Sequence, residues 1–505
     1  MRKTCIAAAL AAVCAGCELA GARADQLREI PPAILYVRAP GSADGAAPAD
    51  GSEARPFHSL RAALAAAPAG ALLRIDEGVF RESLSITRPV VLLGRGAGRT
   101  RILAADPRDA VVQVRGADHV QIHGLSIEGG AACAAFAGGS HKLQRVVLRG
   151  CTEAGLAGRG AQIELLSSSI ANVSGGAAGR GIDLDGGSLE ARNVRLYAAG
   201  RRAVVLHHAR GTLENVEVRW SSLSALQATG GADARVIGGS YEGFGGAALY
   251  AGASKLTIED AQVGRAEYAV LGYRGAELSI SGGEFTDYGV AGVALVGAHG
   301  SVHGATISRG GTDAAISVTR ADGSRPVLLT DNRMSSPGTM GVHVTESAVT
   351  ARGNTITGAR VDAERDMGDG FYAVDSTVVV EQNVMRGNAG SGVALLRSQV
   401  RLAGNGFIEN GRAGLLMMDQ SRGGASGNTF ERNVKAGVEI GEQSRATLAQ
   451  NRFSGNLRLD VDAGCGKGLA GTADLRGGNL AIAGALRQRS CADEGARAAS
   501  SPGQQ

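Results

Sequence analysis

The sequence predicts an all-β fold, a solenoid of stacked coils with three short parallel strands in each coil, and three observations support this prediction. A short segment with alternating apolar residues recurs about every 22 residues between Gly181 and Gly437. Asparagines recur in the same phase from Asn332 to Asn451. Glycine, with 77 of 505 residues, is about twice as frequent as in average proteins, whereas there are only 11 prolines.

The composition excludes several other classes of protein. Hydrophobic residues make up 44% of the chain and the formal net charge is +4, so most of the chain can bury a core and is not disordered. The glycines follow no Gly-X-Y period, which excludes collagen. Lysines and arginines are spread along the chain without a basic stripe of interleaved aromatics, so nucleic acid is not an expected partner.

Each copy of the repeat begins with a strand that has one buried face. The copies start 21 to 29 residues apart, and two further short strands fit into each period, so one period is one coil. Coils stack at about 4.8 Å, which makes residues at the same register of consecutive copies neighbours in space. The inward column, Ile182 to Val438, is apolar, whereas the outward column, Asp183 to Glu439, is mixed. A functional site is therefore expected on the outward column.

Six asparagines predict a ladder at one corner of the coil. Each recurs in phase with the first strand and is soon followed by an apolar residue. Asparagine tolerates left-handed backbone and can hydrogen-bond its own turn, which suits a tight corner. The six are Asn332, Asn354, Asn383, Asn405, Asn428 and Asn451.

The period and the asparagine column resemble those of the right-handed parallel β-helix proteins of the pectin-lyase-like superfamily. The resemblance runs from about Ala71 to Val461. It implies a parallel β-helix over residues 71–462, with the asparagine ladder between the second and third strands of each coil.

Residues 1–24 are expected to be an export signal. Met1–Lys3 is charged, and the apolar run behind it is too short to span a bilayer as a helix. Ala22–Ala24 has the A-x-A form of a cleavage site before Asp25, whereas the segment ending at Cys17 resembles the lipobox of bacterial lipoproteins. The protein is thus expected to be periplasmic, secreted, or an outer-membrane lipoprotein whose lipid is carried by Cys17.

Residues 25–70 are expected to form an N-terminal strand and loop and a cap helix, Ser59–Ala67. These residues resemble the first segment of exported β-helix proteins, in which a helix covers the open end of the solenoid. Without a cap, the first coil would offer an unpaired strand edge and a bare core.

Residues 463–505 are expected to form a C-terminal cap and a disordered tail, since small and polar residues without a period dominate from about Arg487. Four cysteines follow the export signal, an even number that favours disulfides in an oxidising compartment. Three pairings are open, of which the nearest-neighbour one joins Cys133 to Cys151 and Cys465 to Cys491; four unpaired buried thiols are the alternative.

The first candidate site lies where the period stretches to 26 and 29 residues. There His343 and Tyr372 fall on adjacent coils, and Arg320 comes just past its strand. In family members that act on acidic polysaccharides, a cation on this face neutralises the uronate carboxylate and a base removes the C5 proton. The resemblance implies these roles for Arg320, His343 and Tyr372, and the alternative is a polar pair beside surface ion pairs such as Asp375 with Arg397.

A calcium site is considered in the extra residues of the longest period, Ala359–Asp369. Carboxylate oxygens are ligands that Ca²⁺ favours. The positions of Gly368 and Ala373 depart from the EF-hand pattern and exclude it, so a looser calcium site and a solvated charged loop remain as alternatives. No other cofactor is required. The four acids of this segment are Asp362, Glu364, Asp366 and Asp369.

The second candidate site is Asp183 and Asp185 with His207 on the next coil. Paired carboxylates can supply the acid and the base of glycoside hydrolysis. An Asp–His contact on an exposed sheet is also an ordinary cross-strand pair.

The sequence lacks the sharply defined enzyme signatures of the superfamily. It contains no pectate-lyase Trp-Ile-Asp-His, no polygalacturonase Asn-Thr-Asp with Gly-His-Gly, no pectin-methylesterase Asp-Phe-Ile-Phe-Gly and no alginate-epimerase Asp-Pro-His. The leading hypothesis is therefore an exported β-helix whose long face binds a polysaccharide or a cell-envelope component. The alternative is a polysaccharide lyase, epimerase or hydrolase at His343 and Tyr372, and an accessory factor for assembly of another exported protein is a third hypothesis.

Overall fold

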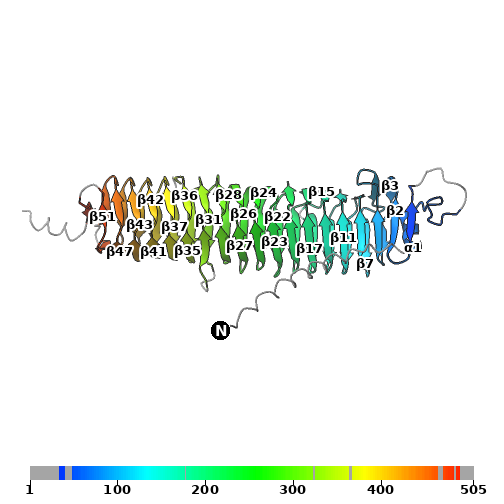
Figure 1. The fold of residues 1–505 in the computed structure, drawn as a ribbon, viewed down its shortest axis with the longest axis horizontal. Coiled ribbons are helices and arrows are strands. Elements are labelled where there is room, and N and C mark those ends of the chain that lie inside the picture. Colours follow the sequence, from blue (N-terminus) through cyan, green and yellow to red (C-terminus); the bar gives the residue numbers. More distant parts are fainter. Residues whose placement is uncertain are drawn as a thin grey trace, which may run out of the picture.

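The computed structural model describes residues 33–39, 48–176, 178–321, 325–362, 367–464, 470–482 and 485–489. These residues form one elongated solenoid, with the N-terminal helix at one end and the last strands at the other (Figure 1). The expected export signal with Cys17, both Cys465 and Cys491, and the tail from residue 490 lie outside the described residues. Among the described residues, no helix is long and apolar enough to cross a membrane.

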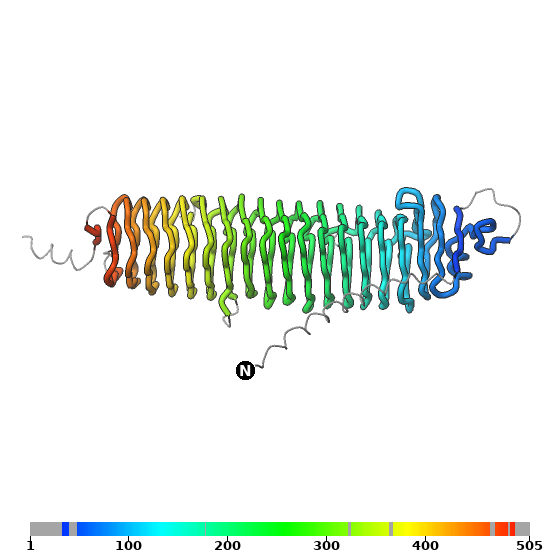
Figure 2. The backbone as a smooth tube through the Cα atoms, viewed as in Figure 1, coloured from blue at the N-terminus to red at the C-terminus, as the bar shows by residue number. Residues whose placement is uncertain are grey.

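Each coil has three parallel strands, as predicted, and the coils stack in an unbroken column (Figure 2). The second strands of the coils form a 19-stranded sheet, and the first and third strands form a 33-stranded sheet. One coil consists of β31 (Ala314–Thr319), β32 (Val327–Thr330) and β33 (Arg333–Ser335). In β24 (Ser240–Gly252), β26 (Gln262–Tyr273) and β28 (Glu284–Val296), a third strand runs directly into the first strand of the next coil.

The first strands pair in the register that the repeat predicts. Asp183 pairs with Val205, His343 with Tyr372, and so on along the solenoid to Glu439. Because successive strand residues point to opposite faces, this register places the apolar column inside and the mixed column outside. The core is correspondingly regular: the rings of Phe407, Phe430 and Phe453 on consecutive third strands stack with centroids 5.0 Å apart.

The six asparagines form one buried ladder at the corner between the second and third strands. The side-chain oxygen of each accepts a hydrogen bond from the backbone N–H of the asparagine one coil before it, or, for Asn332, from Ala305. Asn479 continues the ladder beyond Asn451. In the N-terminal half of the solenoid the same corner holds apolar residues such as Val194 and Val216.

Two further ladders escaped the sequence analysis, although both repeat at the same period. One is at the corner between the third strand and the next coil, and the other is at the corner between the first and second strands. They consist of Asn388, Asn410, Asn433 and Asn456, and of Ser347, Ser376, Ser398, Ser421 and Ser444.

The N-terminal end carries the expected cap helix, α1 (Leu60–Ala66), with Ser59 as its N-cap and Ala67 as its C-cap. Its buried face contacts the first coils through Leu60 and Ala63. The buried carboxylate of Glu82 accepts hydrogen bonds from the backbone N–H groups of Leu60 and Arg61 and from the Ser59 hydroxyl. The helix start is therefore tied to the first coil.

The stack of strands extends past the boundaries expected at residues 71 and 462. At the N-terminal end, β1 (Ile34–Val37) pairs in parallel with β2 (Ala71–Ile75). At the C-terminal end, β50 (Thr472–Leu475), β51 (Leu480–Ala481) and β52 (Gln488–Arg489) add a last partial coil.

Candidate functional site

His343, on β34 (Met340–Thr345), is hydrogen-bonded at both ring nitrogens. Its Nδ1 lies 3.0 Å from Oδ1 of Asp313, and its Nε2 lies 3.1 Å from Oγ1 of Thr345. With the carboxylate accepting the Nδ1–H, Nε2 carries the lone pair and accepts the hydroxyl proton of Thr345. The Asp313–His343–Thr345 chain can therefore pass a proton, in the manner of a base oriented by a carboxylate.

Tyr372, on β37 (Phe371–Val374), lies beside His343 with ring centroids 5.7 Å apart. Burial, and after it the carboxylate of Asp369, raise the pKa of Tyr372. A tyrosine that removes a proton from a sugar must first lose its own, so a raised pKa favours a donor role over a base. In this pair, His343 is the better base.

Arg320 lies apart from this pair. It follows β31 in a left-handed turn with φ of 48°, and its backbone N–H donates to the carbonyl of Thr345, 2.9 Å away. Its neighbour in the stack is therefore Glu346, which is three residues, or about 10 Å, along the strand from His343. Among the described residues, no hydrogen bond or ion pair joins the Arg320 guanidinium to His343 or Tyr372. The same column of turns contains the expected surface pair of Asp375 and Arg397, 2.8 Å apart.

Of the four acids considered for calcium, the structure describes Asp362 and Asp369; Glu364 and Asp366 lie outside the described residues. Asp369 is buried, with 6% of its surface exposed, and its Oδ1 accepts a hydrogen bond of 2.6 Å from the backbone N–H of Ser391 on the next coil. That oxygen anchors two coils together, which fits a structural role better than a ligand in a projecting loop.

The second candidate group lies in a groove of about 1010 Å³ on the first-strand face. Asp183, Asp185 and His207 all line it, on adjacent coils. The groove crosses six consecutive first strands, which are β7 (Val112–Arg115), β10 (Ala132–Ala137), β13 (Ala154–Arg159), β16 (Arg180–Asp185), β19 (Arg202–His207) and β22 (Ser224–Thr229).

The floor of this groove consists of small side chains in its middle part. Ala135 and Ala157 occupy the outward column between Gln113 and Asp183, so two coils in succession present only a methyl group there. An extended ligand lying along the column can thus approach the backbone closely.

Four arginines line the same groove. Arg115 and Arg159 lie at the ends of their strands, and Arg180 and Arg202 lie at the starts of theirs. Arg180 forms an ion pair of 2.6 Å with Asp183. The structure gives no ion pair to Arg115, Arg159 or Arg202 among the described residues. Sequence reasoning identified the acids of this groove and missed its arginines.

Arg202 has an unsatisfied donor. Its Nε is buried without a hydrogen-bond partner, as is the Nε of Arg180 on the preceding coil. Burial, followed by the charges of Arg201 and Arg180, lowers the pKa of Arg202. A buried donor without a partner costs about 1–3 kcal/mol.

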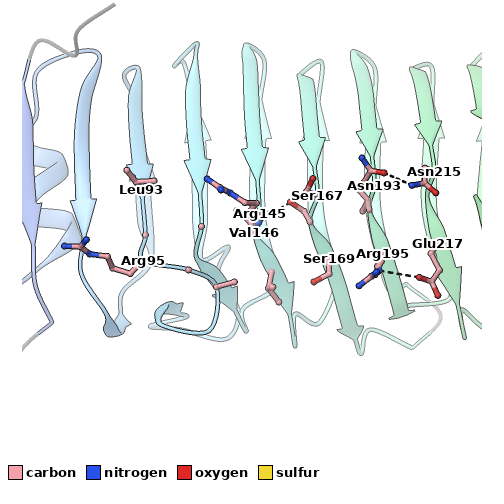
Figure 3. Close-up of a pocket in the computed structure, with 17 residues that line it drawn as sticks. Leu93, Arg95, Arg145, Val146, Ser167, Ser169, Asn193, Arg195, Asn215 and Glu217 are labelled. Atoms are coloured by element: carbon pink, nitrogen blue, oxygen red, sulfur yellow. Dashed lines mark hydrogen bonds and ion pairs between the residues drawn. The ribbon is translucent and has the colours of Figure 1, made fainter. Parts of the chain in front are cut away.

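A second hollow of about 830 Å³ lies at the corner between the second and third strands (Figure 3). Its polar groups largely satisfy one another: Arg195 lies 3.5 Å from Glu217, and the Asn215 amide donates to Asn193 over 2.6 Å. This hollow therefore has less unsatisfied polarity to offer a ligand than the arginine groove.

A disulfide joins Cys133 on β10 to Cys151, which lie 18 residues apart with Cα atoms separated by 5.7 Å. It joins the first strand of a coil to the corner that follows its third strand, and both cysteines are fully buried.

Comparisons with known proteins agree with this fold. Residues 291–457 match the family model described as right handed beta helix region. No curated protein matches the sequence.

Several solved structures are similar to the chain. The A-module of a mannuronan C-5 epimerase of Azotobacter vinelandii is 15% identical, with 84% of this chain and 94% of that one covered and a TM-score of 0.29. A periplasmic alginate epimerase is 11% identical, covering 80% and 79%, with a TM-score of 0.34. A pectin methylesterase from Erwinia chrysanthemi is 12% identical, covering 58% and 91%, with a TM-score of 0.22.

These likenesses carry no argument about what this chain binds. The fold itself follows from the matched segment and from the identical three-strand coils that continue on both sides of it. The chain is a right-handed parallel β-helix repeat protein.

Proposed function

We propose that this β-helix binds an acidic polysaccharide along the arginine groove, with a carboxylate of the polymer paired to Arg202. The observation that carries the proposal is the guanidinium of Arg202, which lines the groove and forms no ion pair among the described residues. Guanidinium groups bind carboxylates through two parallel hydrogen bonds, which suits the uronate units of such polymers.

The groove differs in this respect from other parts of the surface. Elsewhere arginines are commonly neutralised by neighbouring coils: Arg309 is paired with Asp287, and Arg397 is paired with both Asp375 and Asp419. Three groove arginines without an ion pair among the described residues, Arg115, Arg159 and Arg202, lie over a floor of alanines. They fit a linear anionic ligand that supplies the missing negative charge.

Equilibrium binding of polygalacturonate and of alginate to the purified chain, measured by calorimetry with neutral dextran as the reference polymer, tests this proposal. Arg202→Gln should weaken binding by about tenfold or more, because a hydrogen bond to a charged group contributes about 1.5–3 kcal/mol. Arg210→Gln is the matched control, since Arg210 is an exposed arginine on the same coil but on the second-strand sheet. Equal affinity of both variants and the wild type would reject the groove as the binding site.

A second candidate function is a polysaccharide lyase, epimerase or hydrolase at His343, and the Asp313–His343 hydrogen bond favours it. Here His343 acts as the base and Tyr372 as the proton donor. Incubation with uronate and neutral polymers, with and without calcium, followed by absorbance of unsaturated products and a reducing-end assay, would detect turnover. His343→Ala and Tyr372→Phe should abolish any product without altering the circular dichroism spectrum; product that survives both changes would rule this site out.

We also propose that the protein is exported and that Cys17 is the site of a lipid anchor or lies within a cleaved signal. The charged and apolar N-terminus supports export, and a disulfide is typical of oxidising compartments. Fractionation of cells that express the wild type and Cys17→Ser tests both points. Loss of the membrane-bound fraction in Cys17→Ser would support the anchor, and an unchanged cytoplasmic fraction in both would reject export.

A further inference from the structure

We infer that Asp185, His207 and His208 form a binding site for a divalent transition-metal ion, of the class to which zinc belongs. One ring nitrogen of each histidine and one carboxylate oxygen of Asp185 lie within 4.8 Å of one another. This inference concerns metal binding and does not depend on the polysaccharide proposed above.

The backbone brings the two adjacent histidines to one surface. Consecutive residues of a strand point to opposite faces, so His207 and His208 would be separated if β19 continued. Instead His208 has a φ of 49°, and this left-handed residue ends the strand. The two imidazole rings consequently lie with centroids 3.8 Å apart.

The third ligand comes from the preceding coil. Asp185 is the register partner of His207, and its Oδ1 lies 3.6 Å from Nδ1 of His208. Arg159, the register partner of Asp185 one coil earlier, makes no ion pair with it among the described residues, so the carboxylate remains available.

His207 is oriented by a hydrogen bond outside the cluster. Its Nδ1 lies 3.0 Å from the hydroxyl oxygen of Thr229 on the next coil. When Nδ1–H donates to this oxygen, Nε2 keeps its lone pair, the arrangement found for most metal-bound histidines. Such a partner fixes the tautomer and the ring orientation before any metal arrives.

A glycine keeps the space beside both rings open. A Cβ on Gly230 would lie 2.7 Å from Cε1 of His207 and 2.9 Å from Nε2 of His208. Any side chain at this position would therefore displace both imidazoles from where they now lie.

Two imidazoles and one carboxylate are ligands that suit Zn²⁺, Ni²⁺ and Cu²⁺, whereas Ca²⁺ prefers oxygen ligands alone. Zinc–nitrogen bonds of about 2.0–2.1 Å place tetrahedral ligand atoms about 3.4 Å apart. The present separations, of up to 4.8 Å, require a closure of up to about 1.4 Å, which small side-chain rotations can supply. Three protein ligands leave a fourth position for water. Two of the three, Asp185 and His207, also line the arginine groove.

Titration of the chelator-treated, tag-free full chain with ZnCl₂ by calorimetry tests the site. One equivalent should bind, and His208→Ala and Asp185→Asn should each weaken that binding by about tenfold or more. Cobalt(II) in place of zinc should produce visible absorption bands in the wild type that His208→Ala loses.

The chain offers a matched control in His303. This histidine also lies beside a threonine and an aspartate but makes no ring contact with a second imidazole among the described residues: its Nδ1 lies 2.9 Å from Oγ1 of Thr330 and 3.6 Å from Oδ2 of Asp331. His303→Ala should leave zinc affinity unchanged.

A second pair of variants separates metal binding from backbone effects. Gly230 and Gly231 both have positive φ, of 67° and 77°, but a Cβ on Gly231 would meet nothing within 4 Å. Gly230→Ala should therefore weaken zinc binding, whereas Gly231→Ala should not. Absence of binding to the wild type, or a stoichiometric site that persists unchanged in His208→Ala, would overturn the inference.

Discussion

At Glu128, a carboxylate is held between arginines of the two neighbouring coils. Arg101 donates to it over 2.9 and 2.7 Å, Arg149 over 2.8 Å, and Ser126 over 2.7 Å. Burial alone would raise the pKa of this carboxyl, but the three donors together outweigh it and lower the pKa to about 2. Glu128 therefore stays ionised where most glutamates are protonated.

This lowered pKa predicts an acid-dependent loss of stability. A carboxylate whose pKa is lower in the folded state contributes stability above its unfolded value, near 4.5, and loses it as the pH falls towards about 2. Thermal melts of the wild type should thus shift downward over this interval, and Glu128→Gln should flatten that part of the pH profile. Glu164→Gln is the control, because it removes a carboxylate that is 33% exposed and whose one ion pair among the described residues is with Lys142. Parallel profiles for wild type and Glu128→Gln would contradict the assignment.

At the same scale, sequence reasoning found His343 and missed what holds it. Asp313 lies 30 residues earlier in the chain, in the turn before β31, and its contact depends on how two neighbouring coils are staggered. The sequence also could not show that Arg202 lacks an ion pair, because ion pairs in this fold form between coils and depend on side-chain rotamers. A sequence repeat predicts which strand residues are register partners, but it does not predict which charged side chains lack an ion pair.

Among the structural elements, the corner ladders add side-chain hydrogen bonds between neighbouring coils to those of the backbone. Asn405 is 1% exposed; its side-chain oxygen accepts hydrogen bonds from the backbone and side chain of Asn383, and its amide donates to Val380 and Asn428. Removing this side chain leaves several buried groups without partners, each at a cost of about 1–3 kcal/mol.

Asn405→Ala should therefore lower the melting temperature, by an amount on the order of a few degrees. Gln399→Ala removes an exposed polar side chain from the same coil and should have almost no effect. Differential scanning calorimetry of the two variants provides the comparison. Equal melting temperatures would mean that the ladder contributes little beyond the backbone hydrogen bonds.

Structural elements could be predicted from the sequence where the residues that form them recur once per coil. Residues that recur once per coil, such as Asn332 and Asn354, predicted their corner correctly, and Ser59 marked the start of α1. The serine and second asparagine ladders have the same period and were available to the same reasoning. An N-terminal strand was expected, but its pairing with the stack was not, since β1 and β50 join the sheet through pairings that interrupt the repeat.

For the whole molecule, the net charge of +4 over 505 residues is too small to attract a polyanion from a distance. Binding must then come from the local arginines of the groove and should depend on salt through them. Raising NaCl from about 0.1 M to about 1 M shortens the screening length from about 10 Å to about 3 Å, and polyuronate affinity should fall by about tenfold or more. Affinity that is insensitive to salt would point to apolar contacts instead.

The central claim is that the arginine groove on the N-terminal half of the first-strand face holds an acidic polysaccharide. A crystal structure of the chain with a bound oligogalacturonate tests it most directly. We expect the sugar chain to follow the column of Ala135 and Ala157, with a carboxylate accepting hydrogen bonds from the guanidinium of Arg202. An oligosaccharide bound beside His343 and Tyr372, with the groove empty, would contradict the claim and favour the catalytic alternative.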